Sequence, residues 1–312
     1  MQIQFYFDDN PECTIWDGMW IVRTIEQELD ACDIEAPPRE LFLSYLPKEG
    51  KIVEAGCGLG KWVNYLKQRG YDIVGIDNSE LAVAKLKDFD ESLQVELGDI
   101  LDIHYPDSSL DAYISMGVVE HFEDGPTPAL KEAYRVLKPG GLIFVSVPTV
   151  NVIRKLVRRP LRNAINTVPR SLIMKLRLCW GGLKRHSIRA VINAILPETI
   201  KGLLLGKGSR GKGSIGKYYH FLEYRYSKAE LEDFLKQTGF EVIETIPHDF
   251  YDSKEHAIGL VVDFPFLGIR NGVNFQLTSP GKMISRVLDS ISPWIACSSV
   301  ICVARSHKRS TT

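Results

Sequence analysis

Glycines and acidic residues follow two apolar segments of the sequence in an order that suits a nucleoside ligand. The turn EAGCGLG begins at Glu54 and places Gly56, Gly58 and Gly60 directly after the apolar segment KIVEA. Glycines let a backbone approach a ligand closely and point its amides at it. Asp77 ends the next apolar segment, YDIVGID. A carboxylate there can accept two hydrogen bonds from a ribose diol.

The spacing of the glycines disfavours a dinucleotide such as NAD. A dinucleotide-binding turn has the pattern G-x-G-x-x-G, with the third glycine three positions after the second. Lys61 stands at that position, and Gly60 comes one residue earlier. Glu54, just before the turn, also suits an ammonium group better than a pyrophosphate. Asp99, in the segment GDI, is expected near the same crevice.

The elements that must position these residues are strands alternating with helices. Strands are expected at KIVEA, YDIVGID, LQVEL, LDAYISM and LIFVSVP, and helices over Lys61–Arg69, Ser79–Lys87 and roughly Pro126–Leu137. Such alternation indicates right-handed βαβ units and a parallel, doubly wound sheet. Ligands bind such sheets beyond the carboxyl ends of the strands. The segment CSSVICVARS predicts a final antiparallel strand.

In combination, these motifs resemble the class I S-adenosylmethionine-dependent methyltransferases, particularly the branch of quinone-biosynthesis and small-molecule enzymes. VEAGCGLG, VGID, GDI, LDAYISMGVVEHF and LKPGG stand in the family's order over about residues 45–150, and the likeness resumes at YRYSKAELEDFLKQTGFEVIETI. The resemblance implies an α/β fold, a doubly wound and mostly parallel seven-stranded sheet with helices on both faces. It also implies S-adenosyl-L-methionine as the cofactor.

The resemblance also assigns cofactor-binding roles by position. Glu54 and the loop Gly56–Gly60 would surround the methionine end of the cofactor. Asp77 would bind the ribose hydroxyls, and Asp99 with Ile100 would border the adenine. Two of these roles have a plainer alternative, because the glycines could simply form a tight turn and Asp99 could be a helix cap.

Three residues are candidates for catalysis: Glu120, His121 and His220. Positioning alone can supply about 7–11 kcal/mol of the barrier, so an acid or base is needed only if the acceptor loses a proton. Glu120 and His121 follow LDAYISM, and His220 lies in YYHFLEYRYS, which family topology would put over the cofactor. Alternatively, His121 bonds nearby backbone and shapes the pocket, and Tyr218–Ser227 covers the sheet edge with half-buried aromatics.

Two family features are missing from this sequence. In one quinone-related branch, a Glu three positions before the Glu-His pair completes a metal site, but here that position is Gly117. We therefore predict no metal. The tetrapeptide Asn/Asp-Pro-Pro-Tyr/Phe, with which related enzymes hold an amide or exocyclic amine, does not follow LDAYISM. Methylation of adenine N6 or glutamine nitrogen is therefore disfavoured.

The charge of the chain is unevenly distributed. The formal net charge is −1, yet residues 151–217 contain 16 Lys and Arg and one acid, Glu198, for a net charge of +15. Apolar residues recur at helical spacing among the basic ones, as in Ile188, Val191, Ile192 and Ile195. This basic insert suits the interface of an anionic membrane, or else forms a helical cap or lid. With one aromatic residue, Trp180, it lacks the stacking surfaces that nucleic acids use, so nucleic acid is disfavoured.

The domain prediction has three parts. Residues 1–150 form N-terminal helices and the cofactor-binding half, 151–217 the basic insert, and 218–312 the second half with an apolar insertion at about 250–295. Further apolar stretches at Ala257–Ile269 and Lys282–Ile295 favour a lipophilic acceptor.

We predict methyl transfer from S-adenosylmethionine to oxygen or carbon of a lipophilic or lipid-linked acceptor at a membrane surface. The alternatives are a soluble small-molecule or sugar methyltransferase with the insert as a lid, or a non-catalytic membrane-attached scaffold. The start of the chain lacks the pattern of a signal peptide, no apolar run reaches about 18 residues, and the six cysteines include no Cys-x-x-Cys pair. A cytoplasmic protein, peripheral on the membrane, is expected.

Overall fold

The computed structural model describes residues 2–8, 20–21, 23–34, 36–152, 218–248, 267–270, 274–277, 279–295 and 297–308. The chain divides into two units, of which the first comprises Met1–Thr149, Ser214–Tyr251 and Ser299–Thr312, and the second Val150–Gly213 and Asp252–Ser298. The predicted basic insert from residue 153 onward and most of the apolar stretch at 257–269 lie outside the described residues.

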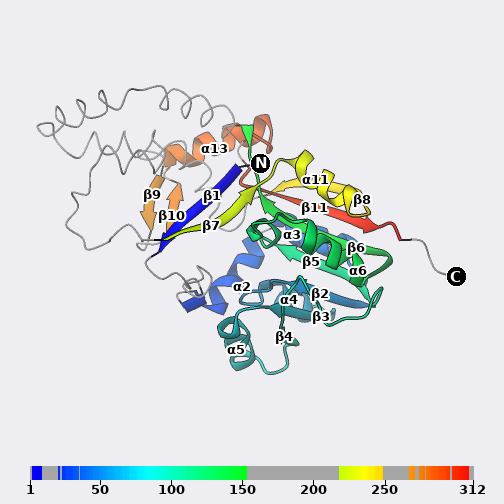
Figure 1. Ribbon diagram of the computed structural model, residues 1–312. Helices are drawn as coiled ribbons and strands as arrows, with labels where there is room; N and C mark the ends of the chain where they lie inside the picture. The colour runs from blue at the N-terminus through cyan, green and yellow to red at the C-terminus, as the bar shows by residue number, and fades with distance from the viewer. Residues whose placement is uncertain are drawn as a thin grey trace, which may run out of the picture. The chain divides into compact units, whose positions relative to one another are not determined.

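A seven-stranded sheet forms the centre of the first unit, in the order β4-β3-β2-β5-β6-β11-β8 (Figure 1). Its strands are β2 (Lys51–Ala55), β3 (Asp72–Asp77), β4 (Val95–Leu97), β5 (Leu110–Met116), β6 (Leu137–Pro148), β8 (Phe240–His248) and β11 (Ser299–Ser306). The neighbours from β4 to β6 are parallel, while β11 is antiparallel to both β6 and β8. The predicted fold class, the strand count and the antiparallel final strand are confirmed.

Helices cover both faces of this sheet. They are α2 (Ile25–Ile34), α3 (Ala36–Tyr45), α4 (Lys61–Lys67), α5 (Glu80–Phe89), α6 (Thr127–Val136) and α11 (Lys228–Gln237). On one face, Phe42 of α3 packs edge-on against Trp62 of α4 and Phe144 of β6, with ring centroids 5.0 and 5.2 Å apart. Successive strand residues point to opposite faces, so the buried Val145 faces the other side, where α6 contacts β6 and α11.

Capping side chains mark the starts of two of the helices. The hydroxyl of Ser79 accepts a hydrogen bond from the Ala82 N–H and caps α5. Ser227 and Glu230 form a capping box at the start of α11, in which each side chain bonds the other residue's backbone N–H. Both helices begin where the sequence indicates because these bonds satisfy backbone N–H groups that have no partner within the helix.

A second, two-stranded sheet joins distant parts of the first unit. β1 (Gln2–Asp8) pairs antiparallel with β7 (Tyr218–Arg225), with Tyr6 opposite His220 (Figure 1). The sequence predicts only helices before the first strand of the large sheet. The strand at β1 differs from that expectation because its pairing partner lies more than 200 residues away, beyond the reach of local periodicity.

The second unit contains a hairpin and a helix among its described residues. β9 (Leu267–Arg270) pairs antiparallel with β10 (Asn274–Leu277), and α13 spans Ser279–Ile291. The helix overlaps Lys282–Ile295, one of the apolar stretches predicted from the sequence. In the part of the chain that the structure describes, no helix has the length and hydropathy needed to cross a bilayer.

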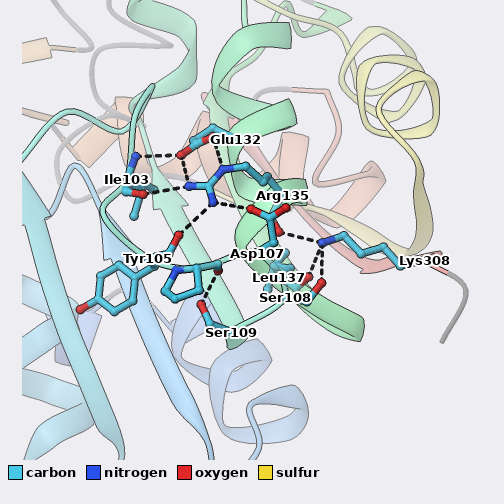
Figure 2. Close-up of polar contacts among 10 residues, drawn as sticks. Ile103, Tyr105, Asp107, Ser108, Ser109, Glu132, Arg135, Leu137 and Lys308 are labelled. Carbon is cyan, nitrogen blue, oxygen red and sulfur yellow. Dashed lines mark hydrogen bonds and ion pairs between the residues drawn. The ribbon is translucent and has the colours of Figure 1, made fainter. Parts of the chain in front are cut away.

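A polar network fastens the amino ends of β5 and β6, the sheet edge opposite the glycine turn. Arg135, in the last turn of α6, donates to the carbonyls of Ile103 and Tyr105 at 2.8 and 2.9 Å and to the Glu132 carboxylate (Figure 2). Lys308 donates to the carbonyls of Arg135 and Leu137 at 2.8 and 2.6 Å. The network therefore joins α6 to the connection between β4 and β5 and to the chain that follows β11.

We expect Arg135→Met to lower the free energy of unfolding by about 2 kcal/mol, because hydrogen bonds to charged groups each contribute roughly 1.5–3 kcal/mol and this side chain makes several. Denaturant titration of the full chain measures the change. Lys131→Met, on the exposed side of the same helix, is the matched control and should leave stability within about 0.5 kcal/mol. Equal losses in both variants would show that the network contributes nothing.

Candidate active site

The turn after β2 has a backbone that only glycine accommodates. Gly56 and Gly58 have φ angles of 76° and 52°, in the left-handed region. A Cβ at Gly56 would lie 2.5 Å from the Val118 side chain, and one at Gly58 would lie 2.7 Å from the Trp20 ring. Gly60, with φ of 68°, is the N-cap of α4. The turn is therefore closely packed, and Trp20, which the sequence analysis does not select, lies against it.

Asp77 joins the end of β3 to this turn. Its side chain is 7% exposed; Oδ2 accepts a hydrogen bond from the Gly58 N–H at 2.7 Å and Oδ1 accepts one from the Ser79 N–H at 2.9 Å. Burial raises the pKa of Asp77, while these two amides act in the opposite direction. A carboxylate has about four lone-pair sites, so Asp77 retains capacity for the hydroxyls of a ribose.

Glu54 lies at the end of β2, beneath the start of α4. Its side chain is 3% exposed, and Oε2 accepts a hydrogen bond from the Val63 N–H at 2.9 Å. Burial raises the pKa of Glu54 to about 8, and the charge of Lys61 partly offsets this. A cationic group brought next to Glu54 would favour its ionised form.

Asp99 and Ile100 follow β4 at the same sheet edge. The Gly98 N–H donates to the carbonyl of Asp77 at 2.9 Å, which brings the two strand ends together. Oδ1 of Asp99 accepts a hydrogen bond from the Leu101 N–H at 2.9 Å, so the carboxylate closes a local turn. This bond resembles the helix-cap role that is the alternative to adenine binding for Asp99. Asp99 is exposed and Ile100 is buried.

The segment after β5 brings Glu120 and His121 toward the glycine turn. Gly117, at φ 75°, donates its N–H to the Ser146 carbonyl, and Val118 packs against Gly56. The short helix η1 (Val119–His121) follows. Glu120 is 1% exposed, and its Oε1 lies 3.7 Å from Nε2 of His121, whose side chain is 17% exposed.

β7 packs against η1 and contributes further charged residues. Glu223 and Arg225 have side chains that are 12% and 13% exposed, with Oε1 of Glu223 2.8 Å from Nη2 of Arg225. His220, the catalytic candidate from this segment, has its backbone in β7, and its side chain lies outside the described residues. Alternation along a strand puts positions 223 and 225 on one face, a signal that becomes usable once the segment is known to be a strand.

Burial shifts the ionisation of this group of residues. The pKa of Glu120 lies well above its usual value, mainly because of burial and in addition because of the charge of Glu223. Burial raises the pKa of Glu223 to about 7 and lowers that of Arg225 to about 10. Perturbed groups gathered at one place are characteristic of functional sites, although structural ion pairs also produce them.

Sequence comparison identifies the domain that carries the glycine turn, Asp77, Asp99 and η1. Residues 53–145 match the methyltransferase domain family. A protein of Mycolicibacterium smegmatis named as a probable S-adenosylmethionine-dependent methyltransferase is 31% identical over 97 residues, which are 31% of this chain and 37% of that protein. A ubiquinone biosynthesis O-methyltransferase of Pseudomonas entomophila is 35% identical over 107 residues, 32% of this chain and 44% of that enzyme. The chain thus spans less than half the length of these curated relatives.

Solved structures agree on the fold. A chain from the complex between the Haloferax volcanii Trm112 methyltransferase activator and a methyltransferase is 16% identical, with a TM-score of 0.53 over 94% of this chain and 98% of that one. An S-adenosylmethionine-dependent methyltransferase from Methanosarcina mazei, also 16% identical, has a TM-score of 0.50 over 86% and 98%. At this identity the likeness shows the fold alone.

The resemblance to S-adenosylmethionine-dependent methyltransferases is therefore confirmed over the domain that contains the glycine turn, Asp77 and η1. S-adenosyl-L-methionine is the cofactor of this domain type. The residues present fit it, since a close-packed glycine turn borders one buried carboxylate at the end of β3 and another at the end of β2. The roles of the individual residues remain predictions.

We expect Asp77→Asn to weaken S-adenosylmethionine binding about 10- to 100-fold, because hydrogen bonds to a charged acceptor contribute roughly 1.5–3 kcal/mol. The same carboxylate holds the glycine turn, which adds to the loss. Titration calorimetry with the full chain measures the affinity. Asp72→Asn, at the exposed opposite end of the same strand, is the control and should bind normally. Unchanged affinity in Asp77→Asn would remove the ribose assignment.

Proposed function

We propose that this protein transfers a methyl group from S-adenosylmethionine to oxygen or carbon of a lipophilic or lipid-linked acceptor at a membrane surface. Methyl transfer is supported by one observation: the glycine turn, Asp77 and η1 lie together at the carboxyl ends of β2, β3 and β5. This is the edge at which doubly wound sheets bind ligands. When bound, the cofactor supplies a methyl group on a positively charged sulfur.

Each residue of the site has a proposed role. Asp77 accepts hydrogen bonds from the ribose hydroxyls, and Glu54 with the glycine turn surrounds the methionine end. Asp99 and Ile100 border the adenine, the buried Ile100 providing an apolar surface. Glu120 and His121, on the segment that packs against the turn, serve the acceptor. Orientation supplies most of the rate, because the leaving group is a neutral thioether.

The apolar character of the acceptor is supported by features outside the matched domain. On α13, Met283, Val287 and Ile291 are 64%, 54% and 68% exposed and are spaced four residues apart, on one face of the helix. Residues 151–217 add a net charge of +15. An apolar helical face and a basic segment in one protein are what anionic membrane surfaces attract. The relative named for ubiquinone biosynthesis fits an acceptor of this kind.

The direct test uses the purified full chain, S-adenosylmethionine labelled on its methyl group, and two acceptor fractions from the same cells. We expect label to enter a product in the lipid extract, one methylene unit heavier by mass spectrometry than its precursor. Asp77→Asn should reduce the labelling. Label appearing in the water-soluble fraction alone would make the protein a soluble small-molecule methyltransferase, and label in neither fraction would favour the scaffold.

Membrane attachment gives a second prediction. We expect the full chain to float with vesicles that contain anionic phospholipid at low salt and to be released at high salt, since each basic residue near such a surface contributes about 1 kcal/mol and salt screens it. Replacing Met283, Val287 and Ile291 by Ser should weaken flotation about tenfold, because apolar burial is lost.

The control for this substitution is Leu43→Ser, which removes an exposed apolar side chain from α3 in the first unit. It should float like the unmodified protein. Flotation that does not respond to salt, or that is absent at low salt, would limit the basic insert to a lid or a cap.

A further inference from the structure

Glu120, Glu223 and Arg225 form a buried group between η1 and β7, here called the Glu-Glu-Arg cluster. Oε1 of Glu223 and Nη2 of Arg225 are 2.8 Å apart, and the charges of both residues act on Glu120. Glu120 Oε2 is buried and makes no hydrogen bond among the residues that the structure describes. The cluster contains two carboxyls and one guanidinium, so ionisation of both acids leaves one uncompensated negative charge.

Among the residues that the structure describes, Glu223 and Arg225 are the charged groups that act on Glu120. His121 lies on the same short helix, with its Nε2 3.7 Å from Oε1 of Glu120. Tyr226, the residue after Arg225, also interacts electrostatically with Glu120. The hydroxyl of Tyr224 donates to the Glu123 carbonyl at 2.8 Å. β6 also packs against η1 and has no ionisable residue after Lys138.

Burial therefore disfavours the ionised form of both carboxyls of the cluster, because an unpaired buried charge is costly. Glu223 lies in an ion pair with Arg225, whereas Glu120 is the more deeply buried acid. Glu120 is thus the group at which a proton is most easily gained.

Glu120 is also close to the place where the reaction would occur. Val118, two residues before it, packs against Gly56 in the turn that would surround the methionine end of the cofactor. In the proposed function, η1 therefore borders the methionine end of the cofactor, whereas Asp77 and Asp99, at the ends of β3 and β4, border the ribose and the adenine.

We propose that Glu120, in its ionised form, takes the proton that a hydroxyl acceptor loses during methyl transfer, and that Glu223 and Arg225 set the pH at which it is ionised. A lone pair of the acceptor oxygen forms the new bond to the methyl carbon, and the carbon–sulfur bond breaks with its electrons remaining on sulfur. The proton of the hydroxyl passes to the Glu120 carboxylate and then to water. This inference rests on the proposed function and narrows it to O-methylation.

The two positioning residues act on Glu120 in opposite directions. Glu223→Gln removes a like charge and should lower the pKa of Glu120, while Arg225→Met removes an opposite charge and should raise it, each by about one unit. Arg225→Lys keeps the charge and should restore the original value. A purely structural role for these residues would not reverse the direction between the two variants.

The first experiment does not depend on turnover. Glutamate labelled with 13C at the side-chain carboxyl is incorporated into the full chain, and the protein is titrated by NMR with saturating S-adenosylhomocysteine. Glu120→Gln assigns the resonance, and Glu241→Gln, at an exposed position of β8, is the control. We expect the midpoint of Glu120 to move down in Glu223→Gln, up in Arg225→Met, and back in Arg225→Lys. Midpoints that are equal in all of these proteins would overturn the proposal.

The second experiment measures methyl transfer to the lipid-extract fraction as a function of pH. The rising limb of the rate should move by the same amounts and in the same directions as the NMR midpoints, and Glu120→Gln should lose at least about 100-fold in rate while still binding cofactor. A limb that stays in place while the NMR midpoints move would show that Glu120 is not the base. If the unmodified protein binds cofactor but transfers no methyl group at any pH, the proposed function itself fails, and the NMR titration still shows whether the cluster exists.

Discussion

The site depends on the carboxylate of Asp77, which accepts one backbone N–H from the glycine turn and another from the start of α5. These bonds join three elements that are separate in the sequence: the end of β2, the end of β3 and the N-terminus of a helix. The glycine turn could not occupy its place with side chains, because Val118 and Trp20 already fill the space next to it. The ligand surface at this edge is therefore fixed before any ligand binds, which reduces the ordering cost of binding.

The structure concentrates buried acids at the edge where a cationic cofactor would bind. Glu54, Asp77 and Glu120 are all less than 8% exposed, and burial raises the pKa of each. Such groups are costly for stability when they are ionised without a partner. A nucleoside that carries a sulfonium and an ammonium would supply positive charge next to them. We therefore infer that the negative charge of these acids complements the positive charge of the cofactor. Their burial lowers the stability of the protein when no cofactor is bound.

Much of this arrangement is visible in the sequence because it is encoded locally. The alternation of apolar runs with helical segments predicts the sheet, Ser79 and Ser227 mark helix starts, and the glycines with Asp77 mark the ligand edge. What the sequence conceals depends on long-range pairing. The strand character of β7 becomes evident only with its partner β1, and without it His220 attracts more attention than Glu223 and Arg225. The exposure of Asp99 likewise follows from a turn closed by Leu101, a detail of one hydrogen bond.

The extent of the family match explains why the methyl donor is easier to infer from the sequence than the methyl acceptor. The match covers residues 53–145, which include the glycine turn, Asp77, Asp99 and η1. β1, β7, α13 and the basic insert all lie outside it. Functional differences between proteins of one fold come from sites grafted on it, so we expect contacts with the acceptor to come from segments outside the matched domain. The Glu-Glu-Arg cluster crosses this boundary, since Glu120 belongs to the matched domain and its two partners come from β7. The cluster therefore joins the matched domain to β7, a strand that lies outside the match.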